Sequence, residues 1–294
     1  MLPEYIKLKD IKPALSGYIR EAHSMLRTDA VPDEKAVHDV RVLLKKSRAV
    51  MKLVKSQIDE PAFNREYNTF REAGRKMQDW RETSVHRKIL KGLRKKHPEI
   101  FAGLKENEKL NFLLRKPETI IEPSPETKEN LEHITTQLYK SGYRLRFQPM
   151  NNFDPHLLLK ELEMTYVNVS GCYITARNSC KPSNLHEFRK KTKDFLYQLY
   201  FFRSLKPGVV RGLEKRLEQL GQNLGKYNDL TVLIKSLDYK YNASGERNYS
   251  MDELIVILRN EQDRYLSRIW PEAYRIFCPG HTLTNLLGYK ILVI

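Results

Sequence analysis

The feature that most constrains this chain is an internal repeat, in which two blocks of sequence recur in the same order. The first block, Val37-His38-Asp39-Val40-Arg41 followed by Lys45, resembles Leu185-His186-Glu187-Phe188-Arg189 followed by Lys193, at an offset of 148 residues. The second block aligns Gly74, Met77, Trp80, Arg81, Glu82 and Val85 with Gly221, Leu224, Tyr227, Asn228, Asp229 and Val232, at an offset of 147. Because both blocks recur in one order, we expect two similar halves that arose by duplication.

Apolar residues recur at spacings of three and four along most of the chain, which is the pattern of amphipathic helices. Alternation of period two, typical of half-buried strands, is never sustained. The pattern predicts eight helices, over Leu8–Arg27, Asp33–Ser56, Phe63–Leu93, Thr127–Lys140, His156–Arg177, Asn184–Ser204, Arg211–Leu237 and Met251–Ile269. We therefore expect an all-α protein with one domain over 1–294, in which repeats 5–120 and 153–270 are joined by 121–152.

The charge of the chain predicts an anionic partner. The chain holds 52 Lys and Arg against 36 Asp and Glu, a formal net charge of +16. Such a surplus opposes compaction through self-repulsion. Nucleic acid, an acidic membrane surface, an acidic protein and polyphosphate are all compatible with bulk charge alone.

The cysteines and the N-terminal stretch point to a reducing compartment. Cys172, Cys180 and Cys278 form no C-x-x-C pair and have no metal-ligand spacing, so we interpret them as buried or free thiols. The stretch from Met1 to Ile11 has no apolar core, and no run approaches the roughly 18 apolar residues of a membrane span. We expect a cytoplasmic protein without membrane insertion and without a cofactor.

A row of basic residues in the first repeat is the strongest functional signal. The row steps by three and four residues, which aligns its side chains along one helix face, and consists of His38, Arg41, Lys45, Arg48, Lys52 and Lys55. One residue earlier runs an apolar row with the same spacing, from Val37 to Val54. Because like charges at this spacing repel by roughly 0.2 to 0.5 kcal/mol per pair and no carboxylate interrupts the row, we expect it to face a groove that binds phosphate groups.

The second repeat keeps the geometry of this row and changes its chemistry. The equivalent row is His186, Arg189, Lys193, Leu196, Tyr200 and Arg203. Leu196 stands where Arg48 does, and Asp194 stands where Lys46 does. We therefore expect the second row to be weaker toward its C-terminal end, with most of the affinity for a polyanion in the first repeat. Tyr197, four residues after Lys193, is included among the candidate binding residues.

His38 and His186 are interpreted as hydrogen-bond donors to an anion, in neutral or protonated form. Arg and Lys one and two turns away would repel a divalent cation and lower the pKa of each imidazole. The sequence holds no H-E-x-x-H motif, Cys/His cluster or P-loop. We therefore predict no metal site.

The second block contributes Arg81 to the candidate binding residues, where the second repeat has Asn228. Glu82 and Asp229 are interpreted as ion-pair partners of neighbouring basic residues rather than as catalytic acids. Trp80 and Tyr227 are interpreted as core aromatics, with stacking on nucleic-acid bases as the alternative.

Together these residues resemble the CHAD family, the conserved histidine α-helical domain. Each half of that family carries a pattern close to H-x-x-R-x-x-x-K followed by L-G-x-x-R-D-x-x-V. Here the patterns read His38, Arg41, Lys45 with Met77-Gln78-Asp79-Trp80-Arg81-Glu82-Thr83-Ser84-Val85, and His186, Arg189, Lys193 with Leu224-Gly225-Lys226-Tyr227-Asn228-Asp229-Leu230-Thr231-Val232. The resemblance spans nearly the entire chain.

The resemblance implies two four-helix bundles related by a pseudo-twofold axis, forming one compact domain with a central basic cleft. It implies non-catalytic binding of inorganic polyphosphate in that cleft, and a possible place at polyphosphate granules. The R-D pair of the family becomes Arg81-Glu82 and Asn228-Asp229, and the fourth base of the second repeat is lost at Leu196. These departures affect how much of the polyphosphate binding the second half contributes.

Two other functions are kept as alternatives. A nucleic-acid-binding protein would explain the charge and the sixteen tyrosines, although no RRM, zinc finger or helix-turn-helix motif is recognised. A metal-dependent phosphohydrolase or phosphohistidine carrier would use His38 or His186, although no convergent carboxylate or metal constellation accompanies them.

Overall fold

The computed structural model describes residues 10–27, 32–77, 79–114, 125–150, 152–238 and 249–288, and only the backbone at 79–84, 125 and 127. The helices are α1 (Ile11–Leu26), α2 (Glu34–Leu53), α3 (Glu60–Lys76), α4 (Asp79–Lys96), α5 (Pro98–Ala102), α6 (Glu108–Leu114), α7 (Pro125–Phe147), α8 (Pro155–Ser179), α9 (Pro182–Leu199), α10 (Pro207–Leu237), α11 (Tyr249–Phe277) and α12 (Leu283–Leu286). Over these residues the regular structure is helical and contains no strand, which confirms the all-α prediction.

Local sequence signals fix where the main helices begin. Asp33 caps α2, because its Oδ1 accepts a hydrogen bond of 2.7 Å from the backbone N–H of Ala36. Asp59 caps α3 in the same way. Proline occupies the first turn of α8, α9 and α10, where its missing N–H costs no helical hydrogen bond. These starts place the two basic rows in register along α2 and α9.

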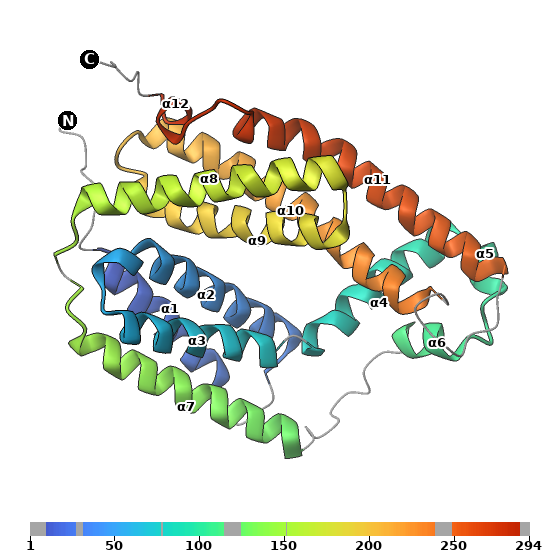
Figure 1. The fold of residues 1–294 in the computed structure, drawn as a ribbon. Coiled ribbons are helices and arrows are strands. Elements are labelled where there is room, and N and C mark those ends of the chain that lie inside the picture. Colours follow the sequence, from blue (N-terminus) through green and yellow to red (C-terminus); the bar gives the residue numbers. More distant parts are fainter. Residues whose placement is uncertain are drawn as a thin grey trace.

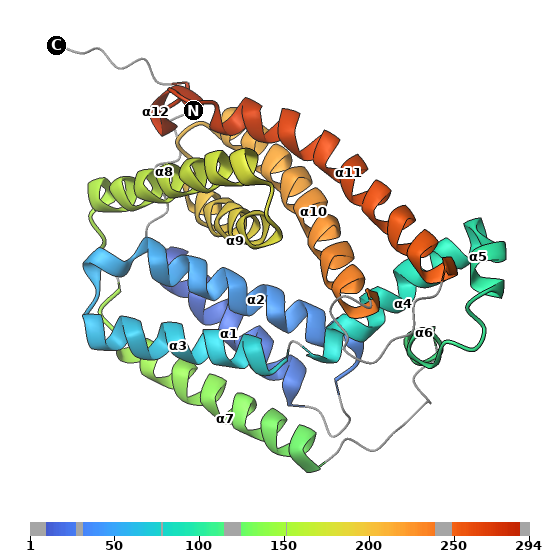
Figure 2. The ribbon, with the colours of Figure 1, turned by 45° about the vertical axis from the view of Figure 1, so that its right-hand side comes forward.

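Eight helices form two groups of four. Helices α1, α2, α3 and α7 pack around one another, and helices α8, α9, α10 and α11 form the second group (Figures 1 and 2). Helix α7 lies within 121–152, the segment expected to join the repeats, and it packs on α1 and α3. The repeat boundaries stay a prediction.

The two groups meet along α2 and α9, which lie side by side in Figures 1 and 2. The side chain of Gln198 on α9 is fully buried and donates a hydrogen bond of 3.1 Å to the carbonyl of Ala49 on α2. One hydrophobic cluster runs through both groups, and it includes Val40 and Leu44 from α2 with Phe188 and Phe195 from α9. The apolar rows beside the two basic rows are therefore buried in a shared core, which fixes the basic rows at its edge.

The third helix of the first repeat differs from the prediction. A single helix over Phe63–Leu93 is wrong, because α3 ends at Lys76 and α4 begins at Asp79. The equivalent part of the second repeat is the continuous helix α10. Helix α4 leaves the first group and, with α5 and α6, covers the ends of α10 and α11 (Figure 1). A second hydrophobic cluster there, which includes Leu90, Phe101 and Leu233, stabilises the break by burying apolar surface.

Other helix limits also differ from the sequence prediction. Helix α11 does not stop at Ile269 but continues through Pro271 to Phe277. Ile269, Ala273 and Phe277 are fully buried on either side of this proline, so packing offsets the lost helical hydrogen bond. The short helices α5 and α6 were not predicted, because their tertiary contacts rather than their length stabilise them.

The thiols of Cys172, Cys180 and Cys278 are free, as expected. Among the helices described, none combines the length and apolar character needed to cross a membrane.

Candidate anion-binding cleft

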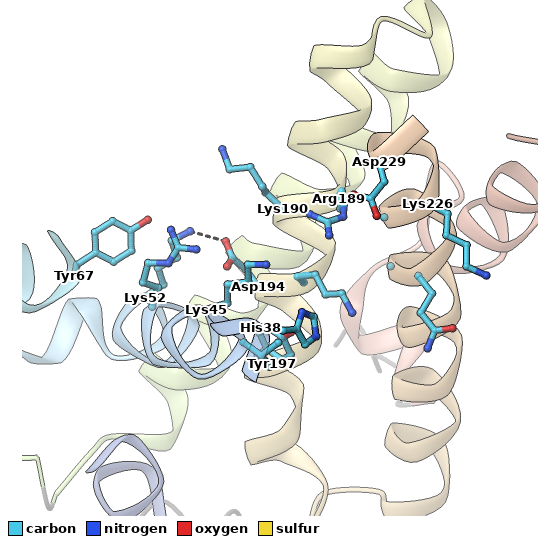
Figure 3. Close-up of a pocket in the computed structure, with 16 residues that line it drawn as sticks. His38, Lys45, Lys52, Tyr67, Arg189, Lys190, Asp194, Tyr197, Lys226 and Asp229 are labelled. Atoms are coloured by element: carbon cyan, nitrogen blue, oxygen red, sulfur yellow. Dashed lines mark hydrogen bonds and ion pairs between the residues drawn. The ribbon is translucent and has the colours of Figure 1, made fainter. Parts of the chain in front are cut away.

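A cleft of about 400 Å³ lies where α2 meets α9 and α10 (Figure 3). The lining residues come from four helices and are His38, Val42, Lys45, Arg48, Lys52, Tyr67, Arg189, Lys190, Lys193, Asp194, Tyr197, Gly221, Gln222, Gly225, Lys226 and Asp229. Seven of them are Lys or Arg and two are Asp. The cleft therefore carries a net positive charge contributed by both repeats.

Helix α2 brings His38, Lys45, Arg48 and Lys52 to the cleft, four of the six residues of the first row. Arg48 is half-buried, and its Nε is shielded from solvent without a hydrogen-bond acceptor among the described residues. No ion pair or cation–π contact in that part of the chain involves Arg48 either. A buried guanidinium donor without an acceptor is costly. Arg48 is therefore a group that an anion entering the cleft would stabilise.

Helix α9 brings Arg189 and Lys193 against glycines of α10. A Cβ placed on Gly221 would lie 2.8 Å from Cε of Lys193, and one placed on Gly225 would lie 3.4 Å from Nε of Arg189. The two glycines thus let both basic side chains lie directly on the α10 backbone. Burial, and next the positive charge of Arg189, lower the pKa of Lys193.

One ion pair joins the two repeats inside the cleft. Lys52 Nζ on α2 lies 2.5 Å from Asp194 Oδ2 on α9, and the two side chains are 31% and 15% exposed (Figure 3). Burial alone would lower the pKa of Lys52, but the Asp194 carboxylate outweighs it and holds that pKa above its usual value. Lys52 also lies 5.6 Å from the ring centroid of Tyr67. Lys52, one of the cations of the cleft, is therefore already paired with the carboxylate of Asp194.

Tyr197 lies at the base of the cleft and is 7% exposed. Burial raises the pKa of its phenol to about 12, so the hydroxyl stays protonated at neutral pH. Lys193 Nζ lies 5.9 Å from its ring centroid. The Tyr197 ring therefore contacts the Lys193 ammonium group, and the uncharged Tyr197 hydroxyl does not repel an anion.

Two candidate residues, Arg41 and His186, lie outside the lining of the cleft. Arg41 Nη1 donates a hydrogen bond of 2.5 Å to the carbonyl of Gly74 on α3. His186 is exposed, and its Nδ1 lies 2.7 Å from Oδ1 of Asn228 on α10. Arg81 is in the first turn of α4, and its side chain lies outside the described residues. For Arg41 and His186 the contacts that the structure shows are with neighbouring helices.

The second row leaves the cleft beyond Lys193. Leu196 is 1% exposed and packs in the core. Arg203 Nε and Nη2 each donate a hydrogen bond of 2.8 Å to the Glu214 carboxylate of α10. Tyr200 donates to Glu218, also on α10. The C-terminal part of this row therefore serves the packing of α9 on α10, in line with the expected weakening.

The second block is only partly described. Tyr227 is 7% exposed and belongs to the hydrophobic core, as predicted, while the side chains of Trp80 and Glu82 lie outside the described residues. Asp229 lines the cleft, and its side chain lies next to that of Arg189 (Figure 3).

The sequence interpretation missed several lining residues. Gly221, Gln222, Gly225, Lys226 and Asp229 share one face of α10, and their spacing of three and four residues was the available signal. Lys190 neighbours Arg189 and also pairs with Glu187 at 2.6 Å. Tyr67 gave no signal, because it comes from α3 and reaches the cleft only through the packing of that helix on α2.

The arrangement suits anion binding better than metal binding. In the part of the chain that the structure describes, no group of three His, Cys, Asp or Glu side chains is placed to hold a metal ion. Lys and Arg from two facing helices instead supply donors that match phosphate oxygens.

Comparison with known proteins identifies the family of the chain. No curated protein matches the chain. The sequence model of the CHAD domain family matches residues 14–238, which is more than half of the chain and includes both basic rows and both second blocks. The chain therefore belongs to the CHAD domain family.

Proposed function

We propose that this protein binds inorganic polyphosphate without hydrolysing it, in the cleft between α2 and α9. Membership of the CHAD domain family supports a polyphosphate-related role. The observation that carries the finer proposal is the convergence of seven Lys and Arg on one cleft, among them Arg48, which has no hydrogen-bond or ion-pair partner in the described part of the chain.

The chemistry of the ligand follows from the chemistry of the lining. Arg48 and Arg189 present planar guanidinium groups that bind phosphate oxygens through two parallel hydrogen bonds. Lys45, Lys190 and Lys193 add compact charges on flexible stems, which tolerate a ligand that changes shape. A flexible chain of repeating phosphates matches such a lining, because each segment presents the same oxygens to whichever cation it meets.

Binding measurements on cleft variants test the proposal. The double variant Lys45→Gln with Arg48→Gln should lose roughly tenfold or more in affinity for long-chain polyphosphate, because each charge-assisted hydrogen bond is worth about 1.5 to 3 kcal/mol. Isothermal titration at several salt concentrations should also show a salt slope that is shallower by about one for each lost phosphate contact.

The matched control removes two exposed lysines outside the lining, Lys128 on α7 and Lys160 on α8. Lys128→Gln with Lys160→Gln makes the same change in net charge and should alter the affinity by less than about threefold. Equal losses in both double variants would show that bulk charge rather than the cleft binds polyphosphate, and would refute the proposal. Polyphosphate chain length is followed on gels in parallel, and shortening by the protein would refute the non-catalytic part.

A further inference from the structure

A second groove lies between α1 and α7, on the side of the first bundle that faces away from α8 to α11 (Figures 1 and 2). Its volume is about 460 Å³, and its lining residues are Ser16, Ile19, Arg20, His23, Leu138, Tyr139, Gly142, Tyr143 and Arg146. It shares no residue with the cleft between α2 and α9. The two basic rows do not line this groove and therefore suggest no role for it.

The order of groups along this groove follows from the antiparallel packing of its two helices. Lys12 near the start of α1 donates hydrogen bonds of 3.0 and 2.9 Å to the carbonyls of Arg146 and Gln148 at the end of α7. Further along, the His23 ring lies 5.8 Å from that of Tyr139. The groove therefore presents Arg146 first, then Tyr143 with Arg20, and then Tyr139 with His23. Basic and aromatic groups alternate along its length.

The aromatic rings of this groove are unusually open to solvent. Tyr139 and Tyr143 are 64% and 56% exposed, and Phe147, one turn beyond, is 71% exposed. The steps of four residues place the three rings on one face of α7. Gly142 lines the groove between α1 and α7 and has no side chain. A Cβ placed on it would lie 3.6 Å from Cγ2 of Ile19, which is an ordinary contact. Tyr143 and Phe147 contact each other edge to face at 5.2 Å between ring centroids, and the rings are otherwise open to solvent, as in surfaces that stack flat ligands.

The cations of the groove complement phosphate. Arg20 and Arg146 are exposed, and among the described residues their guanidinium groups make no hydrogen bond, ion pair or ring contact. The lining of the groove includes no Asp or Glu. An anionic group could therefore approach both arginines without displacing a carboxylate, in contrast to Lys52 in the cleft.

We infer that this groove is a second binding site, specific for single-stranded nucleic acid, with bases stacked on Tyr139 and Tyr143 and phosphates held by Arg20 and Arg146. Tyr139 and Arg146 are seven residues apart, which spans about 10 Å at the helical rise of 1.5 Å per residue. Two or three stacked nucleotides at about 3.4 Å each occupy that length. A duplex hides the faces of its bases, so the exposed rings favour a single strand. A bare phosphate polymer offers nothing to stack.

The test measures binding of a fluorescein-labelled oligoadenylate of about a dozen nucleotides by anisotropy, as RNA and as DNA. The double variant Tyr139→Ala with Tyr143→Ala should bind it roughly fivefold or more weakly, since stacking on an aromatic ring is a large part of single-strand affinity. Arg20→Gln with Arg146→Gln should weaken it as well and reduce the salt slope. Neither variant should change polyphosphate affinity by more than about twofold.

Matched controls separate this site from general surface effects and from the cleft. Phe112→Ala with Tyr249→Ala removes two rings that are 66% and 81% exposed on α6 and α11, and should leave oligonucleotide binding unchanged. Lys45→Gln with Arg48→Gln should weaken polyphosphate but not the oligonucleotide. Thermal melts confirm that each variant is folded.

Three results would overturn the inference. Unchanged oligonucleotide affinity in the folded double tyrosine variant would exclude stacking in the groove. Loss of oligonucleotide binding in the Lys45 and Arg48 variant alone would place the strand in the cleft. A change in sedimentation of the tyrosine variant without a change in oligonucleotide affinity would identify the face as a protein interface. The proposed polyphosphate function would survive each of these results, because it is measured separately.

Discussion

The basic rows of α2 and α9 share one sequence pattern, but they use it differently. On α2, four of six row positions line the cleft, from His38 to Lys52. On α9, Arg189 and Lys193 line it, Leu196 is buried and Arg203 turns to a carboxylate of α10. The same helical spacing therefore produces a long cationic edge on one helix and a short one on the other.

The rows differ in their own residues, since Leu196 replaces Arg48, and their partner helices differ as well. At the offset of 147 residues, the α3 position that matches Glu214 is Tyr67. Glu214 of α10 binds Arg203 at the end of the second row, whereas Tyr67 lines the cleft and lies 5.6 Å from Lys52. A carboxylate of α10 thus pairs with the second row, whereas the matching position beside the first row is aromatic and Lys52 pairs instead with Asp194 of α9.

The largest expected effect compares the two rows directly. Reversing the charge of Lys45 and Arg48 on α2 should lower polyphosphate affinity about a hundredfold or more, since two charge-assisted contacts are lost and repulsion is added. The matched reversal of Arg189 and Lys193 on α9 should cost roughly tenfold, because both side chains lie against the α10 backbone and burial lowers the pKa of Lys193. Titration calorimetry at fixed salt measures both. An equal or larger loss on α9 would reverse the assignment of the dominant half.

The second expected effect concerns the ion pair that links the rows. Asp194→Asn should raise polyphosphate affinity by roughly tenfold, because a repelling carboxylate leaves the cleft and Lys52 becomes available. In that background Lys52→Gln should cost more affinity than it does in the parent protein. A double-mutant cycle provides the measurement. If Asp194→Asn weakens binding, the pair positions Lys52 for the ligand instead of competing with it.

A smaller effect is expected from two equivalent glycines. A Cβ at Gly221 would lie 2.8 Å from Lys193 Cε, whereas a Cβ at Gly74 would lie 4.0 Å from Leu44 Cδ1. Gly221→Ala should therefore displace the Lys193 side chain and reduce polyphosphate affinity by about fivefold, which corresponds to roughly one hydrogen bond. Gly74→Ala should leave affinity unchanged. Both should raise the free energy of unfolding, by up to about 1 kcal/mol for a glycine within a helix.

The contrasting glycine variants need both binding and melting data. Loss of affinity in Gly221→Ala with an unchanged or higher melting temperature would locate the effect at Lys193. A lower melting temperature in Gly221→Ala would instead show that α9 and α10 have moved apart, and the loss of affinity would then be structural.

The smallest expected effect is on pH dependence. Burial and Arg189 lower the pKa of Lys193, while Asp194 holds that of Lys52 above its usual value. As pH rises, Lys193 should lose its charge first, so polyphosphate affinity should begin to fall at a pH below the ordinary lysine pKa of about 10.4. Lys52 keeps its charge at that pH. Lys193→Arg should remove this early decline, and a decline that persists in the variant would assign it to another group.

Much of the fold could be predicted because it depends on periodicity and repetition. The spacing of apolar residues identified the main helices of both groups. The break between α3 and α4 could not be predicted in this way. The apolar pattern continues across it, and only the second core with Phe101 and Leu233 reveals that α4 changes its partners.

The site was predictable for the residues that the repeat marks. His38, Lys45, Arg48, Lys52, Arg189, Lys193 and Tyr197 line one cleft. Arg41 and His186 carry the same signal and contact Gly74 and Asn228 instead. Spacing identifies which side chains share a helix face, but it does not show which neighbouring helix covers each turn of that face.

The sequence by itself determined the helical class and the cationic edge of α2, because these depend on the order and spacing of residues within single helices. Only the tertiary structure decided the pairing of Lys52 with Asp194, the approach of Lys193 to Gly221 and the separate aromatic groove of α7. Each of these joins helices that are far apart in sequence. Their relative placement follows from the packing of whole apolar faces, and no local pattern encodes it.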